Sequence, residues 1–269
     1  MTSLLSKIQI ESVYKSFSLD GRQEPVLAGV SITASAGEFV SIIGPSGCGK
    51  STLLNIIAGL EQADAGVVNL DGGPPGKRLG SVGYMQQKDL LLPWRSVLDN
   101  TILGLELQGM PRRQARQQAL DLMEAFGLKG FEYQYPFTLS GGMRQRAAFL
   151  RTMLLGQDLL LLDEPFGALD ALTRVQMQEW LLKIWESLQK TIILITHDVD
   201  EALLLSDRVY VFTARPGRVK MVLDVDLPRP RSHEDTTQAD FISLKSRLLA
   251  PLHEESSRQA QIQRRSPVR

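Results

Sequence analysis

Apolar residues along this chain fall into short runs that predict strands. Residues 8–17 alternate roughly between apolar and polar positions, as a strand with one buried face does. The runs DLLLLD (158–163) and TIILIT (191–196) have no polar alternation, which is typical of strands covered on both faces in a parallel sheet. The same reasoning predicts further strands at 37–44, 81–86 and 208–213.

Other segments repeat apolar residues at helical spacing. In 111–127, Pro111 suits a first helical turn and Gly127 suits the position that ends a helix, and a second helical stripe lies in 174–189. The region from about 90 to 156 carries helical patterns while strands lie on both sides of it. We therefore predict an α/β fold with a mostly parallel sheet and a helical insertion. The two stripes consist of Ala115, Ala119, Leu122, Met123 and Phe126, and of Met177, Leu181, Ile184, Trp185 and Leu188.

Composition excludes several classes of protein. Apolar residues make up 43% of 269 positions, enough for a packed core. The 30 basic and 30 acidic side chains cancel, so no overall field favours nucleic acid or an anionic membrane. A single cysteine, Cys48, excludes an internal disulfide and a cysteine-based zinc site. The first residues lack the apolar core of a signal peptide and no run approaches the ~18 apolar residues of a membrane span, so the chain is expected in the cytoplasm.

The end of the chain differs in composition from the rest. Beyond Pro216 it becomes rich in proline and polar residues, and the last stretch has almost no apolar side chains. Such composition predicts loose attachment or disorder. No internal repeat is present, which indicates one nucleotide-binding unit. We expect one domain over 1–230, with its helical subdomain at about 90–156, and a flexible polar tail over 231–269.

The stretch GPSGCGKST follows the predicted strand at 37–44 and precedes a helical pattern. It matches G-x-x-x-x-G-K-[ST] in the context that makes this pattern specific for phosphate. Gly47 and Gly49 let the backbone wrap phosphate groups, Lys50 supplies a cation, and Ser51 offers an oxygen to Mg²⁺. The alternative is an ordinary glycine-rich turn, and Cys48 is expected to fill a variable slot. The predicted nucleotide-binding residues are Gly44, Pro45, Ser46, Gly47, Cys48, Gly49, Lys50, Ser51 and Thr52.

Two adjacent acids, Asp163 and Glu164, end the predicted strand at 158–163. Carboxylates are costly to bury, so packing alone does not account for them. Asp163 is a candidate magnesium ligand, and Glu164 is a candidate base for an attacking water. Their alternative role is to cap a helix.

The segment LSGGMRQR (139–146) repeats the phosphate-binding logic. Ser140, Gly141 and Gly142 precede a helical pattern, so a second helix N-terminus is available to an anion. The open alternative is that Ser140 is only an N-cap.

In this order and spacing, these motifs resemble the ATP-binding subunit of ABC transporters, from about residue 8 to residue 218. The resemblance implies a P-loop NTPase core of the RecA-like kind with an N-terminal antiparallel β part, and ATP and Mg²⁺ as cofactors. It also implies roles for residues that are unremarkable alone. These are Phe17 for stacking on adenine, Gln87 as a glutamine-loop residue that is catalytic and contacts the metal, Asp170 of a D-loop (167–170), and His197 as a switch histidine.

The resemblance implies partners as well. Two copies would face head to tail, so that the phosphate-binding loop of one and residues 140–142 of the other enclose each ATP. Two transmembrane permease subunits would receive the work of hydrolysis, and an extracytoplasmic solute-binding protein would act through them, with no nucleic acid involved. The chain is therefore expected as a peripheral protein on the cytoplasmic face of a bacterial inner membrane.

A narrower likeness appears in 90–100, 163–174, 196–202 and 214–218, which resemble the nitrate, sulfonate, taurine and bicarbonate importer branch. Segments 149–158 and 177–186 resemble, less specifically, relatives that import thiamine precursors. The solute itself cannot be deduced, because such a subunit does not touch it. The apolar cluster Leu90, Leu91, Leu92 and Trp94 has two interpretations, namely packing inside the helical insertion or a groove for a short helix of a membrane subunit.

Two other functions compete with import. A non-transport ABC protein acting on ribosomes or DNA usually has two fused units or a long coiled coil, whereas Lys50 and Ser140 lie about 90 positions apart in a single copy with no heptad run between them. A kinase that phosphorylates a small molecule would not need residues 139–146. Both features favour transport.

Overall fold

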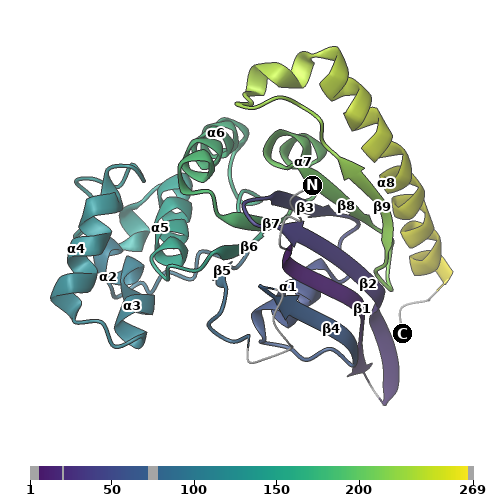
Figure 1. Ribbon diagram of the computed structural model, residues 1–269, viewed down its shortest axis with the longest axis horizontal. Helices are drawn as coiled ribbons and strands as arrows, with labels where there is room; N and C mark the ends of the chain where they lie inside the picture. Colours follow the sequence, from purple (N-terminus) through teal and green to yellow (C-terminus); the bar gives the residue numbers. More distant parts are fainter. Residues whose placement is uncertain (1–5, 20, 72–77, 266–269) are drawn as a thin grey trace.

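The computed structural model describes residues 6–19, 21–71 and 78–265, and its strands form two sheets (Figure 1). The larger sheet has the order β5-β6-β7-β3-β8-β9, with parallel pairing throughout except for β9, which pairs antiparallel with β8. The smaller sheet is antiparallel, in the order β2-β1-β4. The strands are β1 Ser6–Leu19, β2 Arg22–Ser35, β3 Phe39–Ile43, β4 Ala65–Leu70, β5 Gly83–Met85, β6 Leu159–Asp163, β7 Thr191–Ile195, β8 Arg208–Phe212 and β9 Val219–Asp224.

The larger sheet confirms the predicted mostly parallel α/β fold. Every residue of β3, β6 and β7 is buried, which explains why their sequences lack polar alternation. Parallel pairing of these strands also brings their carboxyl ends to one edge of the sheet. The glycine-rich loop follows β3 and the two acids end β6, so the topology gathers the predicted chemistry at that edge.

The smaller sheet confirms the expected N-terminal antiparallel part. The segment 8–17 lies within β1, where Phe17 pairs with Glu24 of β2. Strands β2, β4 and β9 were not predicted. Pro25 and Gly29 interrupt the apolar pattern of β2, yet Gly29 is needed there, because its φ is +74° and an added Cβ would lie 2.9 Å from the Tyr14 hydroxyl.

The chain between β5 and β6 forms the helical subdomain at the left of Figure 1. Ala115, Ala119 and Met123 of the predicted stripe are buried, whereas Leu122 is 36% exposed. The predicted helix ends at Met123, and Gly127 lies in the turn that follows, with φ +63°. The helices are α2 Val97–Thr101, α3 Leu103–Leu107, α4 Arg112–Met123, the 3₁₀ helix Pro136–Thr138, and α5 Gly141–Met153.

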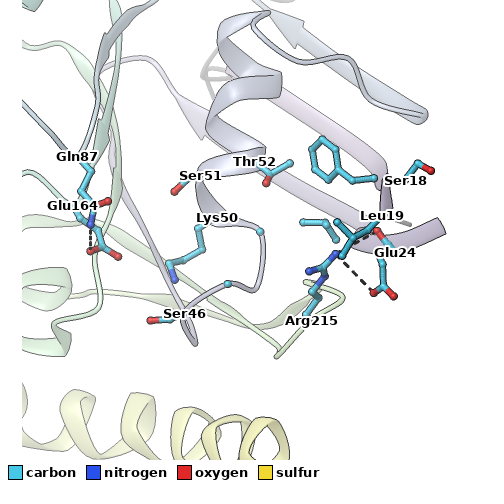
Figure 2. Close-up of a pocket in the computed structure, with 14 residues that line it drawn as sticks. Ser18, Leu19, Glu24, Ser46, Lys50, Ser51, Thr52, Gln87, Glu164 and Arg215 are labelled. Carbon is cyan, nitrogen blue, oxygen red and sulfur yellow. Dashed lines mark hydrogen bonds and ion pairs between the residues drawn. The ribbon is translucent and has the colours of Figure 1, made fainter. Parts of the chain in front are cut away.

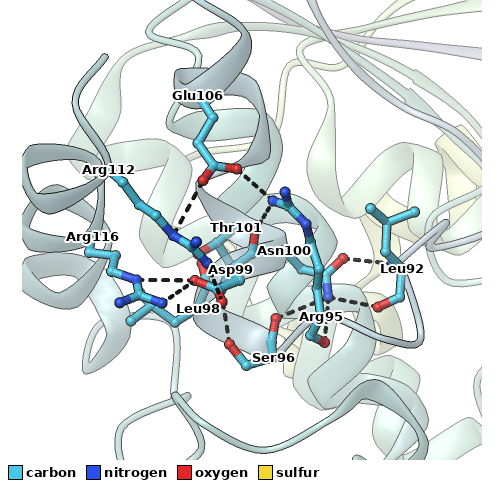
Figure 3. A network of polar contacts seen from close by, with 10 residues as sticks. All are labelled: Leu92, Arg95, Ser96, Leu98, Asp99, Asn100, Thr101, Glu106, Arg112 and Arg116. Atoms are coloured by element: carbon cyan, nitrogen blue, oxygen red, sulfur yellow. Dashed lines mark hydrogen bonds and ion pairs between the residues drawn. The ribbon is translucent and has the colours of Figure 1, made fainter. Parts of the chain in front are cut away.

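A buried asparagine organises the start of this subdomain (Figure 3). Asn100 is fully buried, its Nδ2 donates to the carbonyls of Leu92, Arg95 and Ser96, and its Oδ1 accepts from the Leu92 amide at 2.7 Å. These bonds fix the loop that precedes α2. Asp99, the residue before Asn100, accepts hydrogen bonds from two arginines of α4, which ties that helix to the same loop.

Each of the two interpretations of the apolar cluster 90–94 holds for part of it. Leu91 is buried and Leu92 is half-buried, so these two pack into the subdomain. Leu90 is 49% exposed and Trp94 is 71% exposed, so these two remain on the surface of the described chain.

The remaining helices cover the larger sheet. They are α1 Lys50–Ala58, α6 Ala171–Leu188, α7 Val199–Leu205, the 3₁₀ helix His233–Thr237, and α8 Ala239–Arg265. Within the described residues no helix has both the length and the apolar character that crossing a bilayer requires.

The predicted flexible tail is wrong for the part of 231–269 that the structure describes. Arg231 is buried and donates to four backbone carbonyls, and α8 packs with Phe241 and Leu248 fully buried. The low apolar content misled the prediction, because a helix needs only one apolar stripe to pack on a core. Residues 266–269 lie outside the described residues.

Candidate active site

The glycine-rich loop connects the buried strand β3 to the helix α1, as predicted. Gly49 precedes α1 with φ +105°, and a Cβ there would lie 2.7 Å from a Leu27 methyl carbon. Gly47 has φ +76° with open space around its Cα. Glycine at both positions therefore permits a backbone that other residues would strain. We call residues 44–52 the phosphate loop.

Lys50 lies inside the phosphate loop (Figure 2). Its side chain is only 6% exposed, and Nζ donates to the carbonyls of Gly44 at 2.8 Å and Pro45 at 3.1 Å. An ammonium with two carbonyl partners still has one donor free for an anion. Lys50 is thus positioned by its own loop before any ligand arrives.

Cys48 fills a buried slot of this loop. It is 1% exposed, and burial raises the pKa of its thiol. A thiol that stays protonated is a poor nucleophile. Packing accounts for Cys48, as the sequence suggested.

Asp163 and Ser51 are polar neighbours of Lys50 and are hydrogen-bonded to each other. Burial raises the pKa of Asp163, and the neighbouring Glu164 charge raises it further, while hydrogen bonds from Ser51 and Tyr84 act in the opposite direction. Two neighbouring carboxylates at a partly buried point favour a cation between or beside them. The Ser51 hydroxyl and the Asp163 carboxylate are hard oxygen donors of the kind Mg²⁺ prefers, and Mg²⁺ commonly needs only one or two carboxylates when phosphate oxygens complete its shell. The residues present fit this ion.

Three predicted catalytic residues meet at one carboxylate. Gln87 donates from Nε2 to Glu164 Oε2 at 3.2 Å, and His197 Nδ1 lies 3.4 Å from the same oxygen. The three residues follow β5, β6 and β7, which are neighbours in the sheet. Glu164 has a left-handed backbone, with φ +46°, which is rare for a residue with a Cβ and occurs preferentially at functional sites.

A cavity of about 560 Å³ extends from Gln87 and Glu164 (Figure 2) to Phe17. Phe17 lines one end with 40% of its surface exposed, and Lys15 Nζ lies 5.0 Å from its ring centroid. Gln87 and Glu164 line the other end, and the phosphate loop lies between them. The cavity therefore offers an aromatic face, a phosphate-directed loop and a carboxylate in one continuous space.

Seven predicted nucleotide-binding residues do not line this cavity: Gly44, Pro45 and Cys48 of the phosphate loop, and Ser140, Gly141, Gly142 and Asp170. Ser140 caps α5, its Oγ accepting from the Met143 amide at 3.2 Å, and Asp170 caps α6 by accepting from the Thr173 amide at 3.0 Å. Gly141 lines a separate cavity of about 360 Å³ together with Gln87. The N-cap interpretation of Ser140 is thus present locally, and the second anion site is not assembled with the first in one chain.

Sequence reasoning missed the cavity wall formed by Ser18, Leu19, Glu24, Val26 and Arg215. Arg215 donates from Nε to the Pro25 carbonyl at 3.1 Å. These residues come from the β1–β2 hairpin and from the β8–β9 turn. The segment 214–218 stood out only as part of a family likeness, and no local pattern predicts that it folds against β2.

A buried acid supports the helix that follows His197. Glu201 is 4% exposed, and burial raises its pKa to about 8 despite a hydrogen bond from Gln178 Nε2 at 3.1 Å. The Asp198 charge also raises this pKa, whereas Arg174 lowers it. Glu201 is therefore a largely neutral link between α6 and α7 near neutral pH.

A family model described as ABC transporter matches residues 27–167. Among similar proteins, the formylaminopyrimidine import ATP-binding protein ThiZ of Halalkalibacterium halodurans is 43% identical over 95% of this chain and 98% of its own length. The aliphatic sulfonates import ATP-binding protein SsuB of Bacillus cereus is 42% identical over 90% of this chain and 94% of its own.

A solved structure shares the fold. It is described as the dimeric structure of a post-hydrolysis state of the ATP-binding cassette MJ0796 bound to ADP and Pi, and it is 29% identical to this chain. It covers 82% of this chain and 100% of its own, with a TM-score of 0.72.

Proposed function

The chain belongs to the ABC transporter family as an ATP-binding cassette that hydrolyses ATP, and from this premise we propose that it powers the import of a small solute. The proposed solute is an aliphatic sulfonate or a formylaminopyrimidine, because the similar SsuB and ThiZ proteins are named for the import of these compounds. The observation that carries the hydrolytic part is the meeting of Gln87 and His197 at Glu164, beside the phosphate loop.

The cavity suggests how ATP is held. Adenine stacks on Phe17, and the phosphate groups lie against the amides of residues 44–52 and the Lys50 ammonium. Ser51, Asp163 and Gln87 are the residues that would hold Mg²⁺, which when bound neutralises phosphate charge. The dimensions of the cavity, about 560 Å³, suit a nucleotide-sized ligand.

Glu164 is the proposed base for hydrolysis. Water attacks the terminal phosphorus, the bond to the bridging oxygen of ADP breaks, and the water proton passes to the Glu164 carboxylate. Gln87 and His197 contact Oε2, which leaves Oε1 available to the water. These two contacts restrict the rotamers of the Glu164 side chain and so hold its carboxylate in one orientation.

A second copy of the chain is proposed to complete each site. Ser140, Gly141 and Gly142 begin α5 and do not line the ATP cavity of their own chain, so their anion-directed amides are available to the partner. The dimeric state of the similar MJ0796 cassette supports this arrangement. Asp170 is proposed to act at the same dimer contact.

Membrane permease subunits are the proposed recipients of the motion. Leu90 and Trp94 expose large apolar surfaces on a loop that Asn100 holds rigid, and this loop begins just after Gln87. Contact with a short permease helix would therefore be transmitted to the hydrolytic carboxylate through a few residues. This arrangement implies a peripheral position at the cytoplasmic face of the membrane and a solute-binding protein on the other side.

Affinity purification tests the import proposal. A tagged Glu164→Gln chain, extracted from native membranes in mild detergent with MgATP, should retain a polytopic membrane protein. Reconstituting the wild-type complex in vesicles should then give ATP-dependent uptake of an alkanesulfonate or of a formylaminopyrimidine. Recovery of ribosomal subunits or DNA in place of a membrane protein would contradict import and favour the non-transport alternative.

A further inference from the structure

The inward stripe of α8 changes from apolar to polar along its length. Its apolar members recur at helical spacing and pack against the core: Phe241, Leu244, Leu248 and Leu252. Continuing by three and then four residues leads to Glu255 and Gln259. Glu255 is only 4% exposed. A carboxylate buried this far is costly unless specific partners hold it, so its partners indicate its role.

Glu255 fixes the turn between β8 and β9. Its Oε2 accepts from the Ala214 amide at 2.8 Å, and its Oε1 accepts from Lys220 Nζ at 2.8 Å. Both contacts lower the pKa of Glu255 against the effect of burial, so the group is held as a charged acceptor. The neighbouring Glu254 shares Lys220 but no contact with the turn, and its side chain is 70% exposed.

The turn between β8 and β9 forms part of the wall of the ATP cavity. Gly217 exchanges backbone hydrogen bonds with Val26 and Ala28 of β2, and Arg215 lines the cavity. A Cβ at Gly217 would lie 2.2 Å from the Cys48 carbonyl, so the turn fits tightly against the phosphate loop. Moving this turn would disturb both the hairpin that carries Phe17 and the loop that carries Lys50.

Gln259 contacts the phosphate loop directly. Its Nε2 donates to the Ser46 carbonyl at 2.9 Å, and Ser46 lines the ATP cavity (Figure 2). Figure 1 shows α8 running along β8 and β9 toward this region. One helix therefore contacts two separate loops of the cavity through residues that do not themselves line it.

We infer that Glu255 and Gln259 are positioning residues of the ATP site. By holding the β8–β9 turn and the phosphate loop, α8 keeps the cavity in the form that receives nucleotide, so that less ordering is required on binding. This inference rests on the proposed location of ATP at the phosphate loop. Neither residue touches ATP, and both act through the backbone that does.

Four variants of the full-length chain separate positioning from packing: Glu255→Ala, Glu255→Gln, Gln259→Ala and the control Glu254→Ala. Calorimetric titration with MgADP should show a dissociation constant raised about three- to tenfold in Glu255→Ala and about twofold in Gln259→Ala, the sizes expected when one hydrogen bond to a loop is lost. Glu255→Gln keeps an acceptor for the Ala214 amide and should recover most of the affinity. Glu254→Ala removes the other Lys220 contact and should bind as wild type does.

Two further readouts exclude a merely structural role. KM for ATP should rise more than kcat falls, and amide hydrogen exchange in peptides covering 44–52 and 213–218 should quicken in Glu255→Ala but not in Glu254→Ala. A lower melting temperature with unchanged MgADP affinity and unchanged exchange would overturn the inference. If Glu255→Ala does not fold, unchanged MgADP affinity in Gln259→Ala together with unchanged amide exchange over 44–52 in that variant overturns it as well.

Lys50→Ala distinguishes this inference from the proposed function. Loss of MgADP affinity in Lys50→Ala with no effect in the α8 variants would remove only the positioning role. If affinity is unchanged in Lys50→Ala and MgADP also fails to slow amide exchange over 44–52 in the wild type, the nucleotide does not lie at the phosphate loop, and both proposals fail.

Discussion

Gln87 Nε2 lies 3.2 Å from Glu164 Oε2, although 77 positions separate the two residues. Gln87 follows β5 at the point where the chain leaves for the helical subdomain, and Glu164 directly follows β6 beside the phosphate loop. The subdomain is thereby connected to the candidate base through one side-chain hydrogen bond. A displacement of the subdomain would either carry this carboxylate along or release it.

Replacing Glu164 by glutamine should separate binding from hydrolysis. The amide keeps the size of the side chain and can still accept a hydrogen bond from Gln87, but it cannot take a proton from water. We expect MgATP affinity within about threefold of wild type and a turnover lower by at least about 100-fold. Equilibrium ATP binding and phosphate release measure the two effects, and near-wild-type turnover would assign the base to another group.

Lys50→Ala should instead fail at nucleotide binding. The ammonium is 6% exposed and held by two loop carbonyls, so its loss removes a preorganised, poorly hydrated charge. Charge-assisted hydrogen bonds contribute about 1.5–3 kcal/mol, which corresponds to an affinity loss of about 10- to 100-fold. Lys129→Ala serves as the control, because Lys129 is exposed and pairs with the exposed Glu124. Equal MgADP affinity in the two variants would mean that the backbone amides bind phosphate without the lysine.

Local patterns predicted those parts of the site that are local in sequence. Strands β3, β6 and β7 are uninterrupted apolar runs, and the phosphate loop and the acid pair lie directly at their ends, so parallel pairing alone assembles them. The contact of Gln87 with Glu164 joins distant segments and was not predicted, because only the family resemblance gave Gln87 a role. Glu24 and Arg215 were missed because a hairpin and a turn bring them to the cavity by tertiary packing.

The error over the C-terminal segment has a different origin. Mean composition describes 231–269 as polar, yet Phe241 and Leu248 recur at helical spacing and are fully buried. Arg231 and Glu255 are charged and also buried, because each has several specific partners. A polar composition with few apolar side chains predicts loose attachment, and this prediction fails wherever tertiary partners compensate for desolvation.

Glu201 predicts a pH dependence of stability with a definite sign. Its pKa is raised to about 8 in the folded chain from an ordinary 4.5, so the folded state binds the proton more tightly than the unfolded state does. The stabilisation is therefore complete below about pH 4.5 and is lost as the pH rises toward and through 8, at up to about 1.4 kcal/mol per pH unit. Glu201→Gln is neutral at every pH. It should match wild type near pH 5 and exceed it at pH 9 in the free energy of unfolding.

Urea denaturation of wild type, Glu201→Gln and the control Glu186→Gln from pH 5 to pH 9 measures this difference. Glu186 is exposed on α6, so its replacement should leave the pH profile of wild type unchanged. Parallel profiles for Glu201→Gln and wild type would show that Glu201 is ionised in the folded chain.

The composite site predicts a disulfide between two chains. Ser140 caps α5 away from the cavity of its own chain, and the partner's phosphate loop would bring Ser46 close to it. Ser46 is exposed and contacts Gln259 through its backbone carbonyl, so a cysteine there keeps that contact and avoids the strained backbone of Gly47.

In a Cys48→Ala, Glu164→Gln background, one tagged chain carries Ser46→Cys and a second, differently tagged chain carries Ser140→Cys. MgATP should allow a crosslink between the two tags, because closure must bring the Cα atoms within about 7 Å. Adding Lys50→Ala to the Ser46→Cys chain should abolish it, and pairing Ser46→Cys with the exposed Ser187→Cys of α6 should give none. If Ser46→Cys and Ser140→Cys crosslink only when placed in one chain, or equally well without nucleotide, the head-to-tail arrangement is wrong and residues 140–142 serve only as a cap.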